Sequence, residues 1–466
     1  MENKKTEFNF SFINLGCNKN LVDTQFLLWN IFGLADNNPN YTINYSTEPY
    51  DEEVKYVFLN TCGFISSARF EMFETIKKLI EEKKIVYLMW CGLYYFANLD
   101  KAEIDPEEMK ERKKLLENKD IYKLSWNDWD SISVEKLIEW FDSQNLWDSP
   151  IYKWIRAYTN AEYKFEYLKI AEWCNNSCSF CIIPKIRGKQ KSLSIEDVVA
   201  EVKNMKDAWI EEIILIAQDT NRYWVDLYGK SMLFELLEKI EKIEWEFMYR
   251  ILYLYPDVLT LMQLEKLKNF KKFIPYFDIP LQHISENILK DMWRFYDQKH
   301  IYKLLEFIDK NFEHRFVRTN IIVWFPWETD KNFEELCEFI KWYNFDNIAL
   351  FEYHDEPLAE SSKLPNKVDE KIIHKRFKIL KWIVDKKLTS WTKLNDINLY
   401  SSTGSEWKIW YIMWFKWTEK NPIIIVRPWL HAPEIDSYDE IGLNKIIWAY
   451  SKDGELDLGV KIEYEK

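Results

Sequence analysis

Glycine is scarce in this chain, which has only 10 glycines among 466 residues. Soluble proteins usually contain about 7% glycine, and turns and close backbone contacts depend on it. Tryptophan shows the opposite bias, with 23 residues. The two types together make up about 7% of the chain, the usual share of glycine alone. Either tryptophan is enriched, or many printed tryptophans are glycines in the living organism, encoded by UGA codons that it reads as glycine.

Long apolar runs and an excess of basic charge are also missing. No run of about 18 apolar residues suggests a membrane span, and the first residues, MENKKTEFNFSF, lack the apolar core of a signal peptide. We therefore expect a cytoplasmic protein with no membrane partner. Lysine and arginine number 63 against 76 aspartates and glutamates, a net charge of −13. This balance argues against nucleic acid as a primary partner and favours a basic one.

Cysteine is present in small number but in an informative pattern. Cys174, Cys178 and Cys181 form a C-x3-C-x2-C string after a short apolar run. Three thiolates can hold three irons of a 4Fe–4S cluster and leave the fourth iron open to a ligand. The spacing is the signature of radical S-adenosylmethionine (SAM) enzymes. A zinc site is the alternative, but it usually has a second ligand pair further along, and none follows here.

Three further cysteines follow predicted strands in the N-terminal part of the chain. Strands are predicted at 8–15, 56–60 and 85–89, and they lead to Cys17, Cys62 and Cys91. We expect an α/β domain over 1–140 in which these thiols meet at the carboxyl edge of a parallel sheet. The alternative is three buried structural cysteines, because cysteine is often buried.

The rest of the chain divides into three predicted parts. Residues 141–164 are polar and predict a linker. Residues 165–390 repeat strand and helix, which predicts a partial (β/α)6 barrel with its site at the carboxyl ends of the strands. Its strands are predicted at 168–171, 213–217, 247–252, 273–279, 317–323 and 348–352. Residues 391–466 show short strands with turns, which predicts a small β-barrel.

Polar residues lie at or near the ends of the predicted barrel strands. The candidates for contacts with SAM or substrate are Gln218, Arg250, Gln282, Thr319 and Glu328. Each alone is more often structural, but several around one rim favour a binding site. His283 is interpreted as a buried, hydrogen-bonded histidine, with a catalytic base as the alternative. Cys337 lies in a helical pattern without ligand spacing, so we interpret it as a packing residue.

The chain resembles the methylthiotransferase family of radical SAM enzymes over essentially its whole length. The resemblance is greatest to the RimO type, which modifies ribosomal protein uS12. It is carried by strings at 14–23 (NLGCNKNLVD), 217–223 (AQDTNRY), 280–283 (PLQH) and 430–434 (LHAPE). In this family the C-terminal β-barrel is a TRAM domain.

The chain departs from the family pattern in one consistent way. Tryptophan stands where the family has glycine at Trp90, Trp173, Trp224, Trp324, Trp327 and Trp429. Random drift would scatter over residue types, whereas recoding of UGA explains all six departures together. If the tryptophans are real, their side chains should collide with SAM or the cluster loop, and cofactor binding is in doubt.

The resemblance implies two 4Fe–4S clusters and SAM as cofactors. Cys174, Cys178 and Cys181 would hold the cluster that binds SAM, and Cys17, Cys62 and Cys91 would hold an auxiliary cluster. The implied reaction abstracts hydrogen from the β-carbon of an aspartate in uS12 and adds a methylthio group there. The electron donor and the sulfur donor are not identified by the sequence.

Two other functions stay open at this point. A tRNA adenosine methylthiotransferase would use the same chemistry, but a tRNA-binding C-terminal domain should be basic. Residues 392–466 carry nine lysines and arginines against twelve aspartates and glutamates, which suits a basic protein better. An inactive ribosome-binding relative is the second alternative. A protein that only transfers electrons through two clusters is a weaker hypothesis, because it leaves the polar residues at the barrel rim unexplained.

Overall fold

The structure is a computed structural model, and its chain contacts divide into two units that are described separately. The first unit comprises residues 1–158, 172–191 and 354–363, and the second comprises 159–171, 192–353 and 364–466. The described residues are 6–37, 41–92, 113–115, 117–124, 156–365, 367, 370–394, 410–416, 423–428, 432, 433, 436, 439–442, 446–449 and 461–464.

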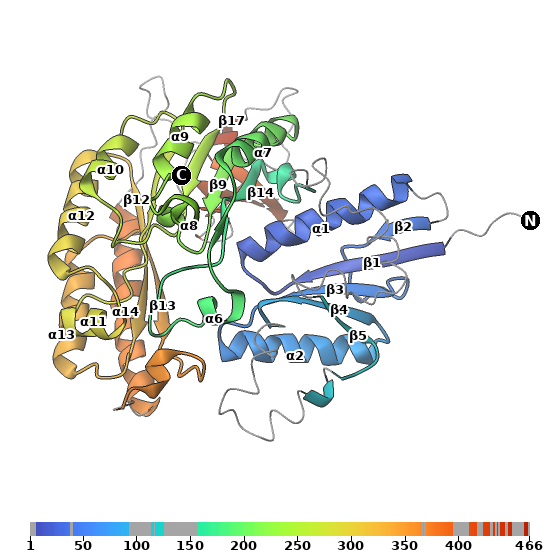
Figure 1. The fold of residues 1–466 in the computed structure, drawn as a ribbon. Coiled ribbons are helices and arrows are strands. Elements are labelled where there is room, and N and C mark those ends of the chain that lie inside the picture. Colours follow the sequence, from blue (N-terminus) through green and yellow to red (C-terminus); the bar gives the residue numbers. More distant parts are fainter. Residues whose placement is uncertain are drawn as a thin grey trace, which may run out of the picture. The chain divides into compact units, whose positions relative to one another are not determined.

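The first unit contains a parallel five-stranded sheet of order β2-β1-β3-β4-β5 (Figure 1). Its strands are β1 (Thr6–Asn14), β2 (Tyr41–Tyr45), β3 (Tyr56–Thr61), β4 (Ile85–Trp90) and β5 (Ile121–Leu124). Helix α1 (Asn18–Asn37) covers one face and α2 (Ser66–Glu81) covers the other. The three central strands confirm the prediction, whereas the edge strands β2 and β5 were not predicted.

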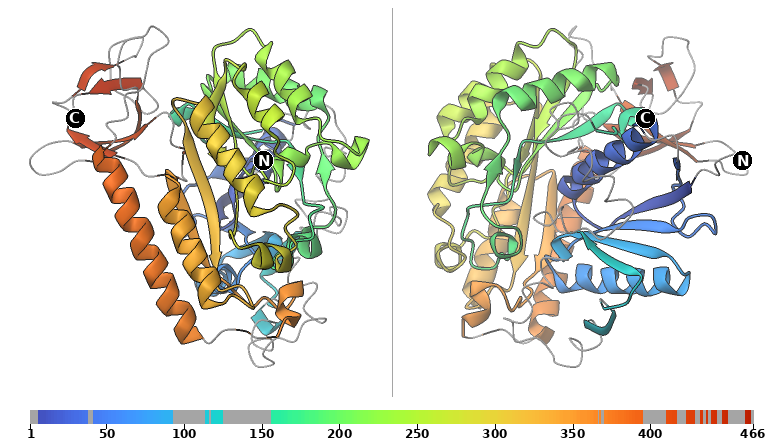
Figure 2. Two further views of the ribbon diagram at one scale, coloured as in Figure 1. Left: turned by 90° about the vertical axis from the view of Figure 1, so that its left-hand side faces the viewer. Right: turned by 45° about the vertical axis from the view of Figure 1, so that its right-hand side comes forward.

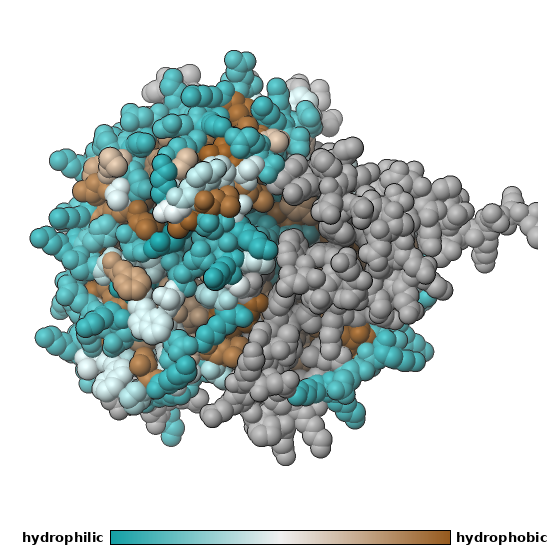
Figure 3. All heavy atoms as spheres, viewed as in Figure 1, coloured by the Kyte–Doolittle hydropathy of each residue, from teal (hydrophilic) through white to brown (hydrophobic). Residues whose placement is uncertain are grey.

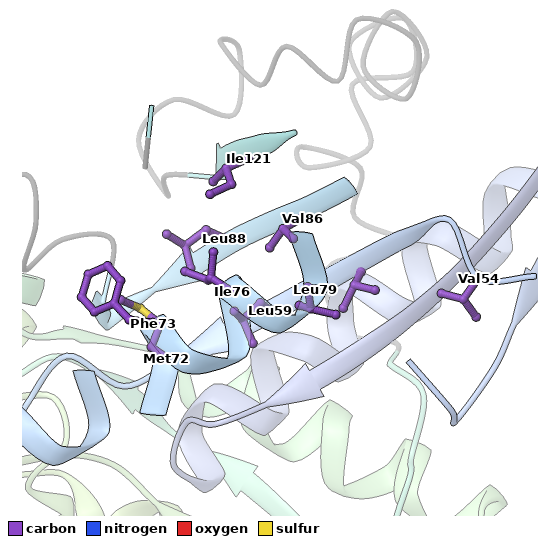
Figure 4. Packing of buried hydrophobic residues seen from close by; sticks show 10 residues of the cluster. Val54, Leu59, Met72, Phe73, Ile76, Leu79, Val86, Leu88 and Ile121 are labelled. Atoms are coloured by element: carbon purple, nitrogen blue, oxygen red, sulfur yellow. The ribbon is translucent and has the colours of Figure 1, made fainter. Parts of the chain in front are cut away.

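An apolar layer between α2 and the sheet holds this unit together (Figure 4). Met72, Ile76 and Leu79 recur at helical spacing on the inner face of α2 and are fully buried. They pack against Leu59 of β3 and Leu88 of β4. Burying one such side chain contributes about 1.5–3 kcal/mol, so this layer fixes the strands whose ends carry cysteines.

The second unit contains a parallel six-stranded sheet of order β13-β12-β11-β10-β9-β6. Its strands are β6 (Phe165–Lys169), β9 (Glu212–Ile216), β10 (Met248–Ile251), β11 (Phe273–Asp278), β12 (Phe316–Val323) and β13 (Asn347–Glu352). Neighbours in the sheet are neighbours in sequence, so right-handed crossovers place the connecting helices on one face (Figures 1 and 2). All six predicted strands are present, with the first beginning earlier than predicted.

The described helices of this unit are α7 (Ile195–Asp207), α8 (Val225–Tyr228), α9 (Leu233–Glu241), α10 (Leu261–Leu267), α11 (Glu286–Asp291), α12 (Gln298–Asn311), α13 (Asp330–Trp342) and α14 (Glu370–Leu394). Four of these helices, α7, α10, α12 and α13, begin after a residue whose side chain accepts from a backbone N–H of the first turn. Ser194 accepts from Asp197 N before α7, and Thr329 forms a reciprocal capping box with Asn332 before α13. None of the described helices has the length and apolar character needed to span a bilayer. On the face shown in Figure 3, hydrophilic side chains predominate among the coloured residues.

The C-terminal segment contains a five-stranded antiparallel sheet of order β16-β15-β14-β18-β17. Its strands are β14 (Trp410–Lys416), β15 (Ile423–Pro428), β16 (Asp439–Gly442), β17 (Ile446–Ala449) and β18 (Lys461–Tyr464). Most of the predicted barrel at 391–466 lies outside the described residues, so its closure stays a prediction. Asp436 connects this segment to the six-stranded sheet by accepting hydrogen bonds from Tyr276 Oη at 2.9 Å and Asn347 Nδ2 at 2.5 Å.

Tryptophan dominates the strained backbone positions of the described chain. Ten described residues other than glycine have a positive φ, and six of them are tryptophan: Trp173 (63°), Trp209 (57°), Trp224 (70°), Trp293 (57°), Trp324 (77°) and Trp327 (74°). Since tryptophan provides 23 of 466 residues, chance would place fewer than one among ten such positions. The left-handed region disfavours a bulky side chain and favours glycine.

Burial of the indole, which could compensate for this strain, differs widely among these positions. Trp209, Trp293 and Trp327 are 66%, 42% and 43% exposed, so they bury little apolar surface. Trp324 is 1% exposed, yet its Nε1 has no hydrogen-bond partner, which is costly for a buried N–H. Trp224 makes a polar contact, because its Nε1 donates to Leu193 O at 2.5 Å, and Lys191 Nζ lies 4.5 Å from the centre of the Trp173 ring.

Four of the six positions singled out in the sequence therefore have the backbone conformation of glycine. Trp209 and Trp293 join them, although the sequence did not single them out. Trp90 ends β4 in extended conformation, and Trp429 lies outside the described residues.

We expect glycine at the six positive-φ positions in the protein made by its own organism, because only glycine occupies this conformation without strain. The measurement is peptide mass spectrometry of protein from native cells, including the tryptic peptides 207–222 and 319–331. Tryptophans encoded by UGG in the same gene are the internal control. Tryptophan in these two peptides would contradict the expectation.

Candidate metal and cofactor sites

The first cysteine set lies at one edge of the five-stranded sheet. The register pairs Asn14 with Asn60 and Asn60 with Met89, so β1, β3 and β4 end in one row. Cys17 follows this row by three residues, and Cys62 and Cys91 follow it by two. Parallel strands bring their carboxyl ends to the same edge, which is where ligands bind in such sheets. The predicted convergence of the three loops is therefore present.

Asn20 connects the three loops through its side chain. Its Oδ1 lies 3.8 Å from the Cys17 Sγ, and its Nδ2 donates to Thr61 O at 3.1 Å and lies 4.0 Å from the Cys91 Sγ. The backbones also approach closely, because a Cβ at Gly63 would lie 2.4 Å from the Cys91 carbonyl oxygen. A side chain at Gly63 would therefore push the Cys62 and Cys91 loops apart.

The second cysteine set lies in a loop of the same unit, within residues 172–191. Asn176 N donates to the Cys174 Sγ at 3.4 Å, and Cys181 N donates to Cys178 O at 3.0 Å. An N–H donated to sulfur stabilises negative charge on the thiolate, the form that binds metal. Trp173, with its positive φ, directly precedes this loop.

Cys91 links the two sets through apolar packing. It is 8% exposed and clusters with Ile182, Ile186 and Ala359. Ile186 belongs to α6 (Ile183–Arg187), the short helix that follows the second cysteine loop. Cys91 of the first set and the residues that directly follow the second cysteine loop therefore belong to one apolar cluster within a single unit.

The donor types fit iron–sulfur clusters. Each set offers three thiols from consecutive or neighbouring loops, and none of the seven cysteines forms a disulfide. Thiolate-only ligation is what iron–sulfur clusters use. Within the described part of the chain, no three His, Cys, Asp or Glu side chains are already gathered at metal-binding distance.

Gln282 and Thr319 lie together just beyond the end of β11, beside the middle of β12. Gln282 has a φ of 69° and pairs with β12, donating from N to Asn320 O at 2.7 Å and accepting at O from Ile322 N at 2.8 Å. The Thr319 hydroxyl donates to Ile279 O at 2.8 Å. The hydroxyl of this β12 residue therefore bonds to the main chain directly after β11. Thr319 thus has a structural role in holding the two strands together.

Glu328 lies at the centre of a buried polar group. Its Oε2 accepts from Trp324 N at 2.6 Å and lies 3.7 Å from His283 Nε2, and its Oε1 accepts from Arg376 Nη1 at 3.2 Å. His283 accepts at Nδ1 from Ser285 N at 3.0 Å, so a neutral ring carries its proton on Nε2, toward Glu328. The interpretation of His283 as a buried, hydrogen-bonded residue is confirmed.

Arg376 was missed by the sequence analysis. It lies in α14, where its guanidinium stacks on the Trp324 ring at 3.9 Å while holding Glu328. Its position in an ordinary helical pattern gives no signal of this contact. Glycine at 324 would remove the indole from the space between Arg376 and the end of β12.

Gln218 and Arg250 lie apart from that group. Gln218 follows β9 and is half-buried. Arg250 is fully buried and pairs with Glu212 at 2.5 Å, and Glu212 is the first residue of β9. The guanidinium is thus directed toward the amino ends of the strands, and its predicted contact with SAM stays a prediction.

Known proteins resemble both parts of the chain. Residues 168–340 match the radical SAM superfamily, and residues 9–111 match an uncharacterized protein family, UPF0004. The ribosomal protein uS12 methylthiotransferase RimO of Dictyoglomus thermophilum is 36% identical over 91% of this chain and 90% of that protein. RimO of Thermosipho africanus is 34% identical over 92% of each.

This chain belongs to the RimO family of radical SAM methylthiotransferases. The family resemblance found in the sequence is thereby confirmed. Among solved structures, the radical SAM methyltransferase TsrM from Kitasatospora setae aligns with 74% of this chain and 75% of its own at a TM-score of 0.49 and 11% identity.

Cys337 is the one cysteine of this RimO family member outside the two sets. It lies in α13, is 8% exposed, and has a thiol pKa raised to about 11 by burial. A thiol with this pKa holds almost no thiolate at neutral pH, so the packing interpretation is confirmed.

In the folded protein without clusters, Cys337 should react with iodoacetamide more slowly than the exposed Cys17 at pH 8. Because only the thiolate reacts, its rate should rise about tenfold per pH unit up to its pKa near 11. Residue-resolved mass spectrometry gives both rates. A Cys337 rate equal to that of Cys17 would contradict this assignment.

Proposed function

We propose that the chain is a methylthiotransferase that adds a methylthio group to the β-carbon of an aspartate in ribosomal protein uS12. One observation carries the proposal: two sets of three cysteines lie in one unit of a chain that matches uS12 methylthiotransferases over 91% of its length. A single set would suit many radical SAM reactions, whereas insertion of a sulfur group needs a second site for the sulfur.

In this proposal each cysteine set holds one 4Fe–4S cluster. Cys174, Cys178 and Cys181 hold the cluster that binds SAM, and Cys17, Cys62 and Cys91 hold the auxiliary cluster. When bound, these groups supply radical hydrogen abstraction and a transferable methylthio group, which side chains alone cannot provide. Asn20 and the Gly63 close contact keep the auxiliary thiols at one sheet edge.

The proposed contacts with SAM come from the strand ends of the second unit. They are Gln218, Arg250, Gln282, Thr319 and Glu328. Burial and the contacts of Gln282 and Glu328 support the role of these two most directly, because both are held rigidly beside His283. Rigid groups position a ligand without further loss of entropy.

The proposed domains are 1–140 for the auxiliary cluster, 165–390 for radical chemistry and 391–466 as a TRAM-like β-barrel, with 141–164 as a linker. The antiparallel sheet of β14 to β18 supports the last of these. The net charge of −13 supports a basic protein partner in preference to tRNA. We place the protein in the cytoplasm, where ribosomal proteins are found.

The reconstituted holoenzyme, with the residues found in the native protein, should convert an aspartate of uS12 to its methylthio derivative. Anaerobic reaction with SAM and a reductant, followed by peptide mass spectrometry, measures this. Total tRNA under the same conditions is the control substrate and should stay unmodified. Methylthiolated adenosine with unmodified uS12 would contradict the proposal.

Substitutions in the two cysteine sets should have different effects on activity. Cys62→Ser should lose methylthiolation but keep SAM cleavage to 5′-deoxyadenosine, whereas Cys174→Ser should lose both. Each variant should hold about four fewer irons, because each loses one 4Fe–4S cluster. Iron analysis and chromatography of 5′-deoxyadenosine measure these effects, with Cys337→Ala as the matched control. Equal loss of SAM cleavage in both cluster variants would contradict the assignment.

A further inference from the structure

A short segment after β13 contacts both cysteine loops. Residues 354–363 follow β13 in sequence but belong to the first unit, with residues 1–158 and 172–191. They include a short 3-10 helix, Glu360–Lys363. We call residues 354–363 the strap.

One end of the strap is fixed to the Cys62 loop by a buried ion pair. Glu356 Oε2 lies 2.8 Å from Arg69 Nη2, and the two side chains are 6% and 5% exposed. Arg69 Nη1 donates to Gly63 O at 3.0 Å, and Glu356 Oε1 accepts from Ser66 N at 3.0 Å. The carboxylate therefore satisfies the first N–H of α2 and also orients the guanidinium under the loop that carries Cys62.

The other end of the strap is fixed to the loop of the second cysteine set. Ser361 N donates to Ser179 O at 2.8 Å, next to Cys178. Lys185 Nζ donates to Leu358 O at 2.6 Å, whereas its pair with Glu360 at 2.5 Å is partly exposed and adds little to this attachment. Between the two ends, Ala359 packs in the apolar cluster with Cys91 and Ile182.

We propose that the strap fixes the two cysteine loops relative to one another, and that Glu356 is its positioning residue. The inference rests on the proposed function, in which a radical made at one cysteine set must meet a methylthio group held at the other. Such a transfer depends on placement, since an error of about 1 Å can cost about 100-fold in rate. SAM cleavage needs only the second set, so it does not depend on where the strap holds the Cys62 loop.

The Glu356–Arg69 ion pair itself supports a positioning role for Glu356. Burying two charges contributes little net stability compared with apolar packing, but removing one partner leaves the other charge uncompensated and frees its contacts. Glu356→Gln keeps the size of the side chain and removes its charge. The Arg69 guanidinium would then lose its charged partner. The hydrogen bonds to Gly63 O and from Ser66 N would weaken as a result.

The test compares Glu356→Gln with Glu360→Gln, a matched change on the same strap. Glu360 makes exposed pairs with Lys185 and Lys363, and exposed pairs contribute little. In the holoenzyme with SAM and uS12, Glu356→Gln should lower methylthiolated uS12 per 5′-deoxyadenosine by at least about tenfold. Iron content and the rate of 5′-deoxyadenosine formation should stay within about twofold of the parent, and Glu360→Gln should change none of these quantities.

A second measurement needs neither clusters nor activity. Hydrogen–deuterium exchange of the cluster-free chain should speed up at Ser66–Arg69 and in the Cys178 loop on Glu356→Gln, but not on Glu360→Gln or in α12. Unchanged exchange overturns the inference. So does an equal loss of SAM cleavage and product, because that is the result of a purely structural role. If the parent leaves uS12 unmodified, the proposed function fails while the exchange result still decides whether the strap holds the loops.

Discussion

The parallel register of β1, β3 and β4 is the constraint on which the first cysteine set depends. Because Asn14, Asn60 and Met89 lie in one row, the loops that follow must leave the sheet side by side. The apolar layer under α2 holds that register, since a slip of one residue would turn Leu59 and Leu88 out of the core. The position of the thiols is thus a consequence of packing well away from them.

A second constraint acts on the backbone at the six positive-φ tryptophans. An L-residue in the left-handed region costs about 1–2 kcal/mol, so six of them would cost about 6–12 kcal/mol in total. Whole proteins are stable by only about 5–15 kcal/mol. Partial compensation exists at Trp224 through its Nε1 hydrogen bond and at Trp324 through the Arg376 guanidinium, but the buried N–H of Trp324 adds to the cost there. The magnitudes therefore favour glycine over an unusual tolerance for tryptophan.

Local patterns in the sequence predicted most of what is local in the structure. The six strands of the second unit and the strand-to-cysteine repeats of the first follow from periodicity and turn residues. The edge strand β2 was missed because YTINY is only five residues long and has one aliphatic residue, although its apolar and polar residues alternate. Glu356–Arg69 and Arg376–Glu328 were missed for another reason: their partners are 287 and 48 residues apart, and such pairs leave no periodic signal. For Arg250 the position in a strand was predicted, but its pairing with Glu212 was not.

These long-range pairs share a physical character that fits a role in placement. Glu356 and Glu328 are both buried carboxylates, and each binds one arginine and one backbone N–H near a loop that the proposed chemistry uses. An apolar contact could supply equal stability, but it would tolerate sliding, whereas a carboxylate with an arginine and an N–H accepts only a narrow geometry. A transfer between two centres is sensitive to a displacement of about 1 Å. The proposed reaction therefore depends more on a fixed position of the loops than on added stability. The buried ion pairs are therefore best understood as fixing where the loops lie, while the apolar layers decide that the units fold at all.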